Sequence, residues 1–463
     1  MSVSDINCYR ESKCESMGNN MRVLLCCVPY GRDNIGDEAI LESIVKILRS
    51  ISSDLDITVS TDEQEFTAKN LGVKTCPLFG FDDPTWDLDE LESELDQADV
   101  VIWGGATGLS DYPEHAVQVL EMAQSRGKKT AVFCTGMNDC LNPFLYRIRP
   151  GIKRDVSEFI KLFSFGFIDF VGRIEARKFS QAHSRIVGVL DKADVVIVRD
   201  AETLDNLRNI GVAREFIHVA CDPAITLEPT PREKARFRND ETGESVNRIP
   251  RRRIGICLSS QSPIKKTSRL AVVLDEIVEK YNADLYMIPM NPLTDRAYMT
   301  RIRMSMRQRN HLHEYPGGEN PTTVAAYAGT MDLIISSRLH LLILGSISHV
   351  PLIGISRGSK VDAFIGQFGL VSTGSVDNPD YDFLLSEVER LLDDSSRLLY
   401  VRHSMNVVRD MKKRLRGGAE ILGRLFGVIN LPAWEQDSGE NFSDNAGLVS
   451  RADEALIETL IRD

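Results

Sequence analysis

The residues best suited to chemistry lie in the segment Ile334–Ile355, "IISSRLHLLILGSISHVPLIGI". Arg338 and His340 stand two residues apart, after an apolar run that predicts a strand and before small and apolar residues that predict a helix. A guanidinium holds a carboxylate or a phosphate through two parallel hydrogen bonds. An imidazole beside it can donate or accept a proton near neutral pH. The pair therefore predicts an anion-binding site that also performs acid–base chemistry.

A second guanidinium occurs in "VIVRD", Val196–Asp200. Arg199 follows an apolar run, so it is expected at the carboxyl end of a strand. Open α/β sheets bind their ligands at that end of the strands. An ordinary ion pair of Arg199 and Asp200 at the surface would have the same sequence, so this motif alone does not establish a ligand site.

The turn in "YGRDNIGDEAIL", Tyr30–Leu41, is unusually polar for a connection between a strand and a helix. Gly36 permits close approach of another group to the backbone. A helix that begins near Asp37 points unpaired N–H groups at whatever lies above the turn. Asn34, Asp37 and Glu38 can hydrogen-bond a ligand, although capping alone explains Asp37 equally well. The turn matches neither the nicotinamide fingerprint nor the P-loop.

A further strand ends in glycines in "VVIWGGATG", Val100–Gly108. The backbone amides around Gly104 and Gly105 could form a concave anion-binding nest. Any turn at a strand end can use two glycines, so the motif is weak by itself.

One motif points to a different chemistry. "GISRG", Gly354–Gly358, matches the nucleophile elbow of esterases and lies between an expected strand and an expected helix. A hydrolase triad needs a later acid and then a histidine from a loop. Only His403 follows, within an expected helix, so the esterase interpretation is disfavoured.

Short apolar runs alternate with helical patterns along most of the chain, which predicts parallel sheets covered on both faces. The polar, charged segment "EPTPREKARFRNDETGESVNRIPRRR" interrupts this alternation, which then restarts. The fold class expected is α/β, with two Rossmann-like domains facing a cleft and helices at the C-terminus. The expected organisation is a flexible leader 1–20, an N-terminal domain 21–227, a linker 228–253, a C-terminal domain 254–375, helices 376–430 and a partly disordered tail 431–463.

The insertion 141–179 is apolar, aromatic and basic. We expect it to form helices packed on the first domain. A membrane-surface helix and a contact between copies of the chain are the alternatives. Basic residues interrupt its apolar runs, which are too short to span a bilayer.

Composition limits the classes of partner. The 463 residues carry a net charge of −12, which argues against nucleic-acid binding but not against a small anion held by a local cluster of cations. The nine cysteines show no zinc spacing and fit free thiols in a reducing compartment. No apolar signal core and no membrane span occur, so we expect a cytoplasmic enzyme, with the inner face of the membrane as an alternative.

Taken together, these motifs resemble the polysaccharide pyruvyl transferase family. "NIGDEAIL" is similar to its N-terminal signature, and "WGGATG" to its glycine turn, although Ala106 stands where the family more often has a third glycine. "VIVRDAETLDNLRNIGV…CDPA" resembles its Arg-Asp segment. "DLYMIPMNPLTD" and "SSRLHLLILGSISHVPLIGISRGSKVDAFIGQFGL" resemble its C-terminal domain. The similarity spans about residues 21–375.

The resemblance implies a fold like that of the B-type glycosyltransferases and a reaction without a metal or resident cofactor. Phosphoenolpyruvate would be the co-substrate, and its pyruvyl unit would pass to a hydroxyl of a polysaccharide or its lipid-linked precursor as a ketal. The N-terminal domain would take the acceptor and the C-terminal domain the donor. The residues implied to contact the donor are Arg199, Arg338 and His340, with Lys360 as a further phosphate contact; Leu339 is expected among the substrate-binding residues.

The roles implied follow from this reaction. His340 would protonate the methylene carbon of phosphoenolpyruvate. Asp37 or Glu38 would deprotonate the acceptor hydroxyl, with Asn34, Gly36, Gly104 and Gly105 lining the same cleft. Two rival functions are a nucleotide-sugar glycosyltransferase and a non-catalytic sugar- or anion-binding relative. No acidic ribose-binding pattern favours the first, and the intact arginines and histidine disfavour the second. A peripheral membrane contact and a homo-oligomer both stay open.

Overall fold

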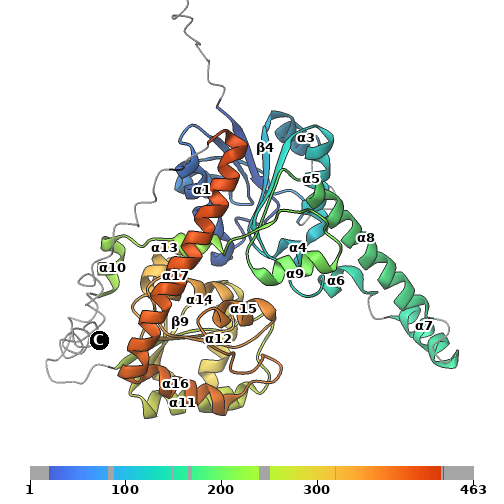
Figure 1. Ribbon diagram of the computed structural model, residues 1–463. Helices are drawn as coiled ribbons and strands as arrows, with labels where there is room; N and C mark the ends of the chain where they lie inside the picture. The colour runs from blue at the N-terminus through green and yellow to red at the C-terminus, as the bar shows by residue number, and fades with distance from the viewer. Residues whose placement is uncertain are drawn as a thin grey trace, which may run out of the picture.

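The computed structural model contains two parallel β-sheets, one above the other in Figure 1, each flanked by helices. The structure describes residues 20–81, 88–148, 151–164, 169–238, 251–318, 320–428 and 431. The predicted leader and almost all of the predicted tail lie outside the described residues.

Seven strands make the first sheet, in the order β3-β2-β1-β4-β5-β6-β7, and every neighbouring pair is parallel. They are β1 (Arg22–Cys26), β2 (Asp56–Ser60), β3 (Lys74–Cys76), β4 (Val100–Gly104), β5 (Lys129–Thr135), β6 (Val195–Val198) and β7 (His218–Val219). The central strands are rich in valine and isoleucine, which suit a sheet covered on both faces. The strand order reverses between β1 and β4, where doubly wound sheets bind ligands.

The helices of the first sheet connect successive strands. The turn "NIGD" starts α1 (Ile35–Ile51), because the Asn34 side chain accepts a hydrogen bond from the Gly36 N–H at 3.2 Å and so caps the helix. The remaining helical elements are α2 (Gln64–Leu71), α3 (Leu88–Gln97), α4 (Gly108–Asp111), α5 (Pro113–Ser125), α9 (Ala201–Asn209) and the 3₁₀ turn η1 (Pro223–Thr226).

Five parallel strands make the second sheet, in the order β10-β9-β8-β11-β12. They are β8 (Arg252–Cys257), β9 (Ala283–Met287), β10 (Leu312–Glu314), β11 (Leu333–Ser336) and β12 (Leu352–Gly354). Its helical elements are α11 (Thr267–Lys280), α12 (Thr294–Ser305), η3 (Arg309–His311), α13 (Pro321–Ala328), α14 (Leu339–Ser346) and α15 (Ser359–Gly366). The predicted α/β class with two parallel sheets is confirmed. Within the predicted linker, residues 231–238 form the helix α10 (Pro231–Arg238).

The predicted insertion forms an arm that extends away from both sheets, on the opposite side of Figure 1 from α17. It contains α6 (Pro143–Tyr146), α7 (Ile152–Phe163) and the first part of α8 (Phe170–Lys192). Tyr146 of α6 is buried against Phe179 of α8, with ring centroids 5.1 Å apart. The prediction that the insertion packs on the first domain is wrong for α7, whose large apolar side chains face solvent. None of the described helices is long and apolar enough to cross a membrane.

The chain then forms α16 (Tyr381–Leu392), α17 (Asp394–Gly423) and η4 (Arg424–Phe426), as predicted for the C-terminus. The 30-residue helix α17 starts beside the second sheet and runs up to the first (Figure 1). It contacts β5, β6, β7 and η1. The Met411 carbonyl accepts a hydrogen bond from Cys221 Sγ at 3.3 Å, and the Arg414 carbonyl lies 2.9 Å from His218 Nε2. A segment of the C-terminus therefore completes the packing of the N-terminal domain.

Candidate active site

The carboxyl ends of the two sheets meet at the start of α1. The Ile35 N–H donates a hydrogen bond to the carbonyl of Met290, which follows β9 in the other domain, at 2.9 Å. A Cβ atom on Gly36 would lie only 2.0 Å from His340 Nδ1, so no other residue fits there without displacing the imidazole. The polar turn and the histidine segment singled out from the sequence are thus in direct contact across the domain boundary.

His340 stands in the first turn of α14, between two carboxylates of the first domain. Its Nε2 lies 3.6 Å from Asp222 Oδ2, and neither buried atom has a hydrogen-bond partner among the described residues. Burial opposes ionisation of Asp222, but His340 and Arg199 hold its pKa below the ordinary value. Asp222 therefore stays charged beside Nε2. The Nδ1 atom packs against Gly36.

The first turn of α1 places a second carboxylate near this imidazole. Asp37 is 7% exposed, and its Oδ2 accepts a hydrogen bond from Asn34 Nδ2 at 2.6 Å. Burial raises the pKa of Asp37, whereas His340, Asn34 and Lys360 act in the opposite direction. A carboxylate with a raised pKa is a stronger base when ionised. Its position suits proton transfer with a hydroxyl bound beside the imidazole.

Glu38, the other candidate base, points back into its own loop. Its Oε1 accepts a hydrogen bond from the Gly31 N–H at 2.7 Å. Burial raises the pKa of Glu38 to about 7, and this hydrogen bond works against the shift. The structure therefore gives Glu38 the task of closing the loop between β1 and α1, away from the imidazole.

Arg338 caps α14 from the second domain and is held by one buried carboxylate. Its Nε and Nη2 donate to the two oxygens of Asp295 at 2.9 and 2.8 Å. Asp295 is fully buried and also accepts the N–H groups of Ser260 and Asn291. This pairing occupies one edge of the guanidinium. On the other edge, Nη1 donates to Gln261 Oε1 at 3.2 Å and has no carboxylate as a hydrogen-bond partner among the described residues.

A second guanidinium, that of Arg357, lies next to the Nη1 edge of Arg338. Arg338 Nη1 and Arg357 Nη2 both donate to Gln261 Oε1, at 3.2 and 3.4 Å, so two like charges share one amide oxygen. Burial, and then the charge of Arg338, lower the pKa of Arg357 to about 10. Its Nη1 donates to Ser259 Oγ at 2.8 Å, so no carboxylate neutralises it among its hydrogen-bond partners in the described chain. Two crowded cations of this kind suit an anionic ligand.

Lys360 of α15 adds a third cation. Burial lowers its pKa to about 8, and three guanidinium charges add to the effect, those of Arg357, Arg199 and Arg338. Asp111, in the first domain, opposes the shift. The mutual influence of these groups means that cations from both domains converge on one region.

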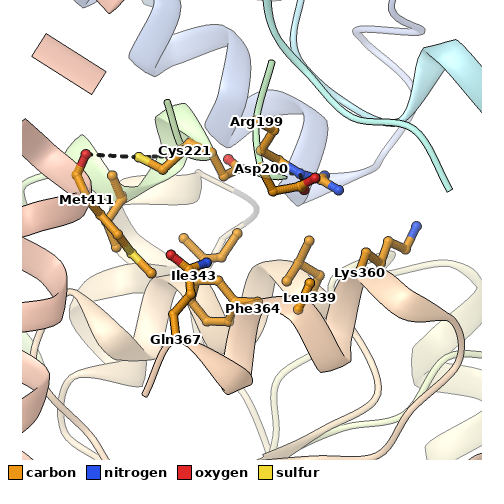
Figure 2. A pocket seen from close by; sticks show the side chains of 12 residues that line it. Arg199, Asp200, Cys221, Leu339, Ile343, Lys360, Phe364, Gln367 and Met411 are labelled. Carbon is orange, nitrogen blue, oxygen red and sulfur yellow. Dashed lines mark hydrogen bonds and ion pairs between the residues drawn. The ribbon is translucent and has the colours of Figure 1, made fainter. Parts of the chain in front are cut away.

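Arg199 reaches this region from the end of β6 and is 7% exposed. Its Nε donates to Asp200 Oδ2 at 3.0 Å, and its Nη1 lies 3.9 Å from Asp222 Oδ2. Figure 2 shows Arg199 and Asp200 above, and Lys360 and Leu339 below, a narrow cavity between the domains. The structure brings Arg199, Arg338 and His340 of the sequence prediction together, with Lys360 beside them.

The predicted glycine nest has a different role. Gly104 packs against Leu25, and its carbonyl accepts a hydrogen bond from Tyr30 Oη at 2.6 Å. Gly105 has a φ of +77° and packs against Ile40, while its N–H donates to the Phe133 carbonyl at 2.7 Å. These glycines let α1 lie close on β4, so they position the turn that touches His340 rather than a ligand.

Sequence reasoning did not single out four polar residues of the site. Asp222 and Asp295 were inside the quoted segments "CDPA" and "NPLTD", but nothing local indicates their partners. Arg357 was inside "GISRG", the motif set aside as an esterase elbow. In this motif, Ser356 donates to Asp362 Oδ2 at 2.6 Å, and Arg357 donates to Gln261 Oε1. Gln261 is the fourth of these polar residues. Among the described residues no cluster of His, Cys, Asp or Glu could hold a metal ion.

Two parallel sheets with a cleft between them and helices at the C-terminus define the fold of the B-type glycosyltransferases and related epimerases. Within this class, a sequence model described as "Polysaccharide pyruvyl transferase" matches residues 34–359. The match covers more than half of the chain, so the chain belongs to the polysaccharide pyruvyl transferase family, as predicted. A comparison with curated protein sequences returns no significant match.

Solved structures share the fold at low sequence identity. MnaA of S. aureus, solved with UDP, aligns with a TM-score of 0.55 at 11% identity, over 89% of this chain and 99% of its own. HepE of Anabaena, solved with UDP-glucose, gives 0.54 at 10% identity over 88% and 100%. UDP-GlcNAc 2-epimerase of Neisseria meningitidis, bound to UDP-GlcNAc, gives 0.51 at 11% identity over 88% and 99%. At these identities the likeness concerns the fold alone.

Proposed function

We propose that this transferase moves the pyruvyl unit of phosphoenolpyruvate onto a sugar of a polysaccharide or its lipid-linked precursor and forms a pyruvate ketal. The observation that carries the proposal is the pair of guanidinium groups, Arg338 and Arg357, that share one amide oxygen of Gln261. Arg199 lies close enough to Lys360 for its charge to lower the pKa of that lysine. A ligand with a carboxylate and a phosphate matches four such cations in charge and in geometry.

The acid for the reaction is His340. Its Nε2 lies 3.6 Å from Asp222 Oδ2, and the imidazole would deliver a proton to the methylene carbon of phosphoenolpyruvate. The adjacent carbon becomes electron-deficient and accepts the oxygen of a sugar hydroxyl, whose proton passes to Asp37. Loss of phosphate and attack of a second hydroxyl complete the ketal. Of the two hydroxyl protons, one balances the proton delivered to the methylene carbon and the other leaves with phosphate.

The cavity beside Arg199 and Lys360 is too small to hold the donor as it stands. The narrow space lined by Arg199, Leu339 and Lys360 has a volume of about 20 Å³, which is room for about one water molecule. Phosphoenolpyruvate is many times larger. We therefore propose that the cleft opens to admit the donor and the sugar; closing it again would exclude water from the electron-deficient intermediate.

The reaction fits the cytoplasm. All seven described cysteines are free thiols, as expected in a reducing compartment. No resident cofactor enters the scheme, since every proton transfer is assigned to a side chain of this chain.

The decisive experiment incubates the full chain with isotopically labelled phosphoenolpyruvate and a panel of lipid-linked and nitrophenyl sugars, followed by mass spectrometry. The expected product carries the labelled pyruvate carbons and lacks phosphorus. A parallel panel of nucleotide sugars tests the competing glycosyl transfer, because the same cations would also hold a diphosphate. Sugar transfer from a nucleotide donor, with no pyruvylated product, would refute the proposal.

A further inference from the structure

The helix α7 turns its apolar side to solvent. Val156, Phe159, Leu162 and Phe163 are 53%, 60%, 73% and 68% exposed. The rings of Phe159 and Phe163 lie 4.3 Å apart and form a pair on this surface. Scattered exposed apolar residues are normal in soluble proteins, but four large ones on a 12-residue helix indicate an interaction surface.

The polar side of α7 holds the helix in this orientation. Lys161 Nζ lies 2.7 Å from Asp169 Oδ2, and Arg154 Nη1 lies 3.8 Å from Glu175 Oε1 of α8. Ser157 is buried. An amphipathic helix that packed on its own protein would face inward with the apolar side. Here the charged contacts to α8 and the residue before it leave that side free.

Cations border this surface. On α8, Phe170 and Ile174 are 51% and 48% exposed and extend the apolar area. Arg173, Arg177 and Lys178 follow on the same part of α8 and are also exposed. These positive charges stand out in a chain whose net charge is −12. Exposed aromatic groups next to basic side chains are the features of helices that lie on anionic membranes.

We infer that the surface formed by α7 and the first two turns of α8 binds an anionic lipid bilayer. The 12 residues of α7 make a helix of about 18 Å, which can lie in the headgroup plane but cannot cross a bilayer. A second copy of the chain fits less well, because a symmetric contact would bring the same cations together. The inference rests on the proposed function in one respect only: binding to a bilayer would hold the cleft near a lipid-linked acceptor.

The test measures flotation of the full chain with phosphatidylcholine vesicles that contain phosphatidylglycerol, and with pure phosphatidylcholine vesicles. The wild type should float with the anionic vesicles and much less with the neutral ones. The double variant Phe159→Ser, Phe163→Ser should bind at least about tenfold more weakly, since two aromatic groups no longer enter the interface. The double variant Arg177→Gln, Lys178→Gln should lose roughly tenfold and most of the preference for phosphatidylglycerol.

The matched control is Phe66→Ser on α2, where a phenylalanine is 52% exposed far along the chain from the arm. It should bind vesicles like the wild type. All variants should keep the melting temperature, and pyruvyl transfer to a soluble sugar should not change. The inference is overturned if the wild type ignores anionic vesicles, or if the aromatic variant merely converts a dimer to monomers in sedimentation. Vesicle binding without any pyruvyl transfer would refute the proposed function and leave this inference intact.

Discussion

The two edges of the cleft differ in charge. The C-terminal edge presents Arg338, Arg357 and Lys360, and the only carboxylate directly bonded to this group within the described chain is Asp295, which holds Arg338. The N-terminal edge presents the carboxylates of Asp111, Asp200 and Asp222 around the buried guanidinium of Arg199, and that of Asp37 near His340. Under the proposed function, the anionic donor would bind at the C-terminal edge and the sugar hydroxyl at the N-terminal edge.

His340 belongs to the cationic edge by its position in the chain and to the acidic edge by its contacts. It starts a helix of the second domain but touches Gly36 and faces Asp222 of the first. Its environment is therefore complete only when the two edges meet. If His340 is the proton donor of the proposed reaction, closure of the cleft would assemble it and so couple the chemistry to the domain movement.

The largest loss of turnover is expected from a substitution of His340, where the two edges of the cleft meet. His340→Gln should keep most of the affinity for phosphoenolpyruvate, because glutamine can still hydrogen-bond, and should lose about 10²–10⁴-fold in turnover, the usual contribution of a positioned general acid. Steady-state rates and calorimetric titration separate the two quantities. The matched control is His313→Gln on β10, which should leave both unchanged. Turnover within a few-fold of wild type would make the imidazole structural.

The next largest effects should distinguish the roles of Arg357 and Arg338, two cations of the C-terminal edge. Arg357→Ala should weaken phosphoenolpyruvate binding by about 1.5–3 kcal/mol, the value of hydrogen bonds to a charged group, without lowering the melting temperature, since it relieves repulsion with Arg338. Arg338→Ala should also destabilise the fold by about 3–5 kcal/mol, because Asp295 stays buried without its partner. Arg199→Ala should weaken donor binding as well.

Calorimetry and thermal unfolding of the same preparations check these three variants. Normal donor affinity in both Arg338→Ala and Arg357→Ala would move the donor away from the C-terminal edge. A large loss of stability in Arg357→Ala would mean that this guanidinium supports the fold and not the ligand.

A smaller effect concerns pH. The pKa of Lys360 is lowered from 10.5 to about 8, so the cation is present below that pH and lost above it. Affinity for phosphoenolpyruvate should therefore fall, by up to about tenfold, as pH rises through 8. The stability of the free enzyme should change in the opposite direction, because the unfolded chain binds the proton more tightly between pH 8 and 10.5. Lys360→Gln should abolish both dependences, and their persistence in this variant would assign them to another group.

The smallest effect should come from Glu38. Its carboxylate bonds the Gly31 N–H instead of facing His340, so Glu38→Gln should leave turnover within about twofold and cost about 1 kcal/mol of stability. Asp37→Asn, next to it in sequence, should instead lose turnover. A comparison of the two variants by steady-state rates and thermal unfolding identifies which carboxylate is the base, and equal losses of turnover would contradict the assignment.

The sequence predicted the fold well because the periodicity of apolar residues is a local signal. Each of the two sheets and the C-terminal helices can be followed from alternating runs. The rule that parallel strands present their carboxyl ends at one edge placed Arg199 at that edge of the first sheet, and Arg338 and His340 at that edge of the second. Their meeting followed from the expectation that the two domains face one cleft. The pairing of Arg338 with Asp295, 43 residues away, has no such signal. The same is true of Gln261 and Arg357, which become neighbours only when β8 and β12 lie in one sheet.

Two sequence expectations failed for an identifiable physical reason. The glycines of "WGGATG" were expected to bind a ligand, but close helix–strand packing requires small residues just as strictly as close ligand approach does. The apolar residues of α7 were expected inside, because burial is the usual fate of such residues. Their exposure depends on the ion pairs that hold the polar side of α7 to α8. Composition cannot reveal which side of a helix is anchored.

The crossing helix α17 also sets an order of events during synthesis. The strands β6 and β7 are translated about two hundred residues before Met411 and Arg414, which cover Cys221 and His218. Although domains generally fold as units from the N-terminus, this one emerges from the ribosome with part of its surface still bare. The first domain reaches its final packing only after the second domain has been made. The nascent chain therefore stays a target for chaperones until its last long helix arrives.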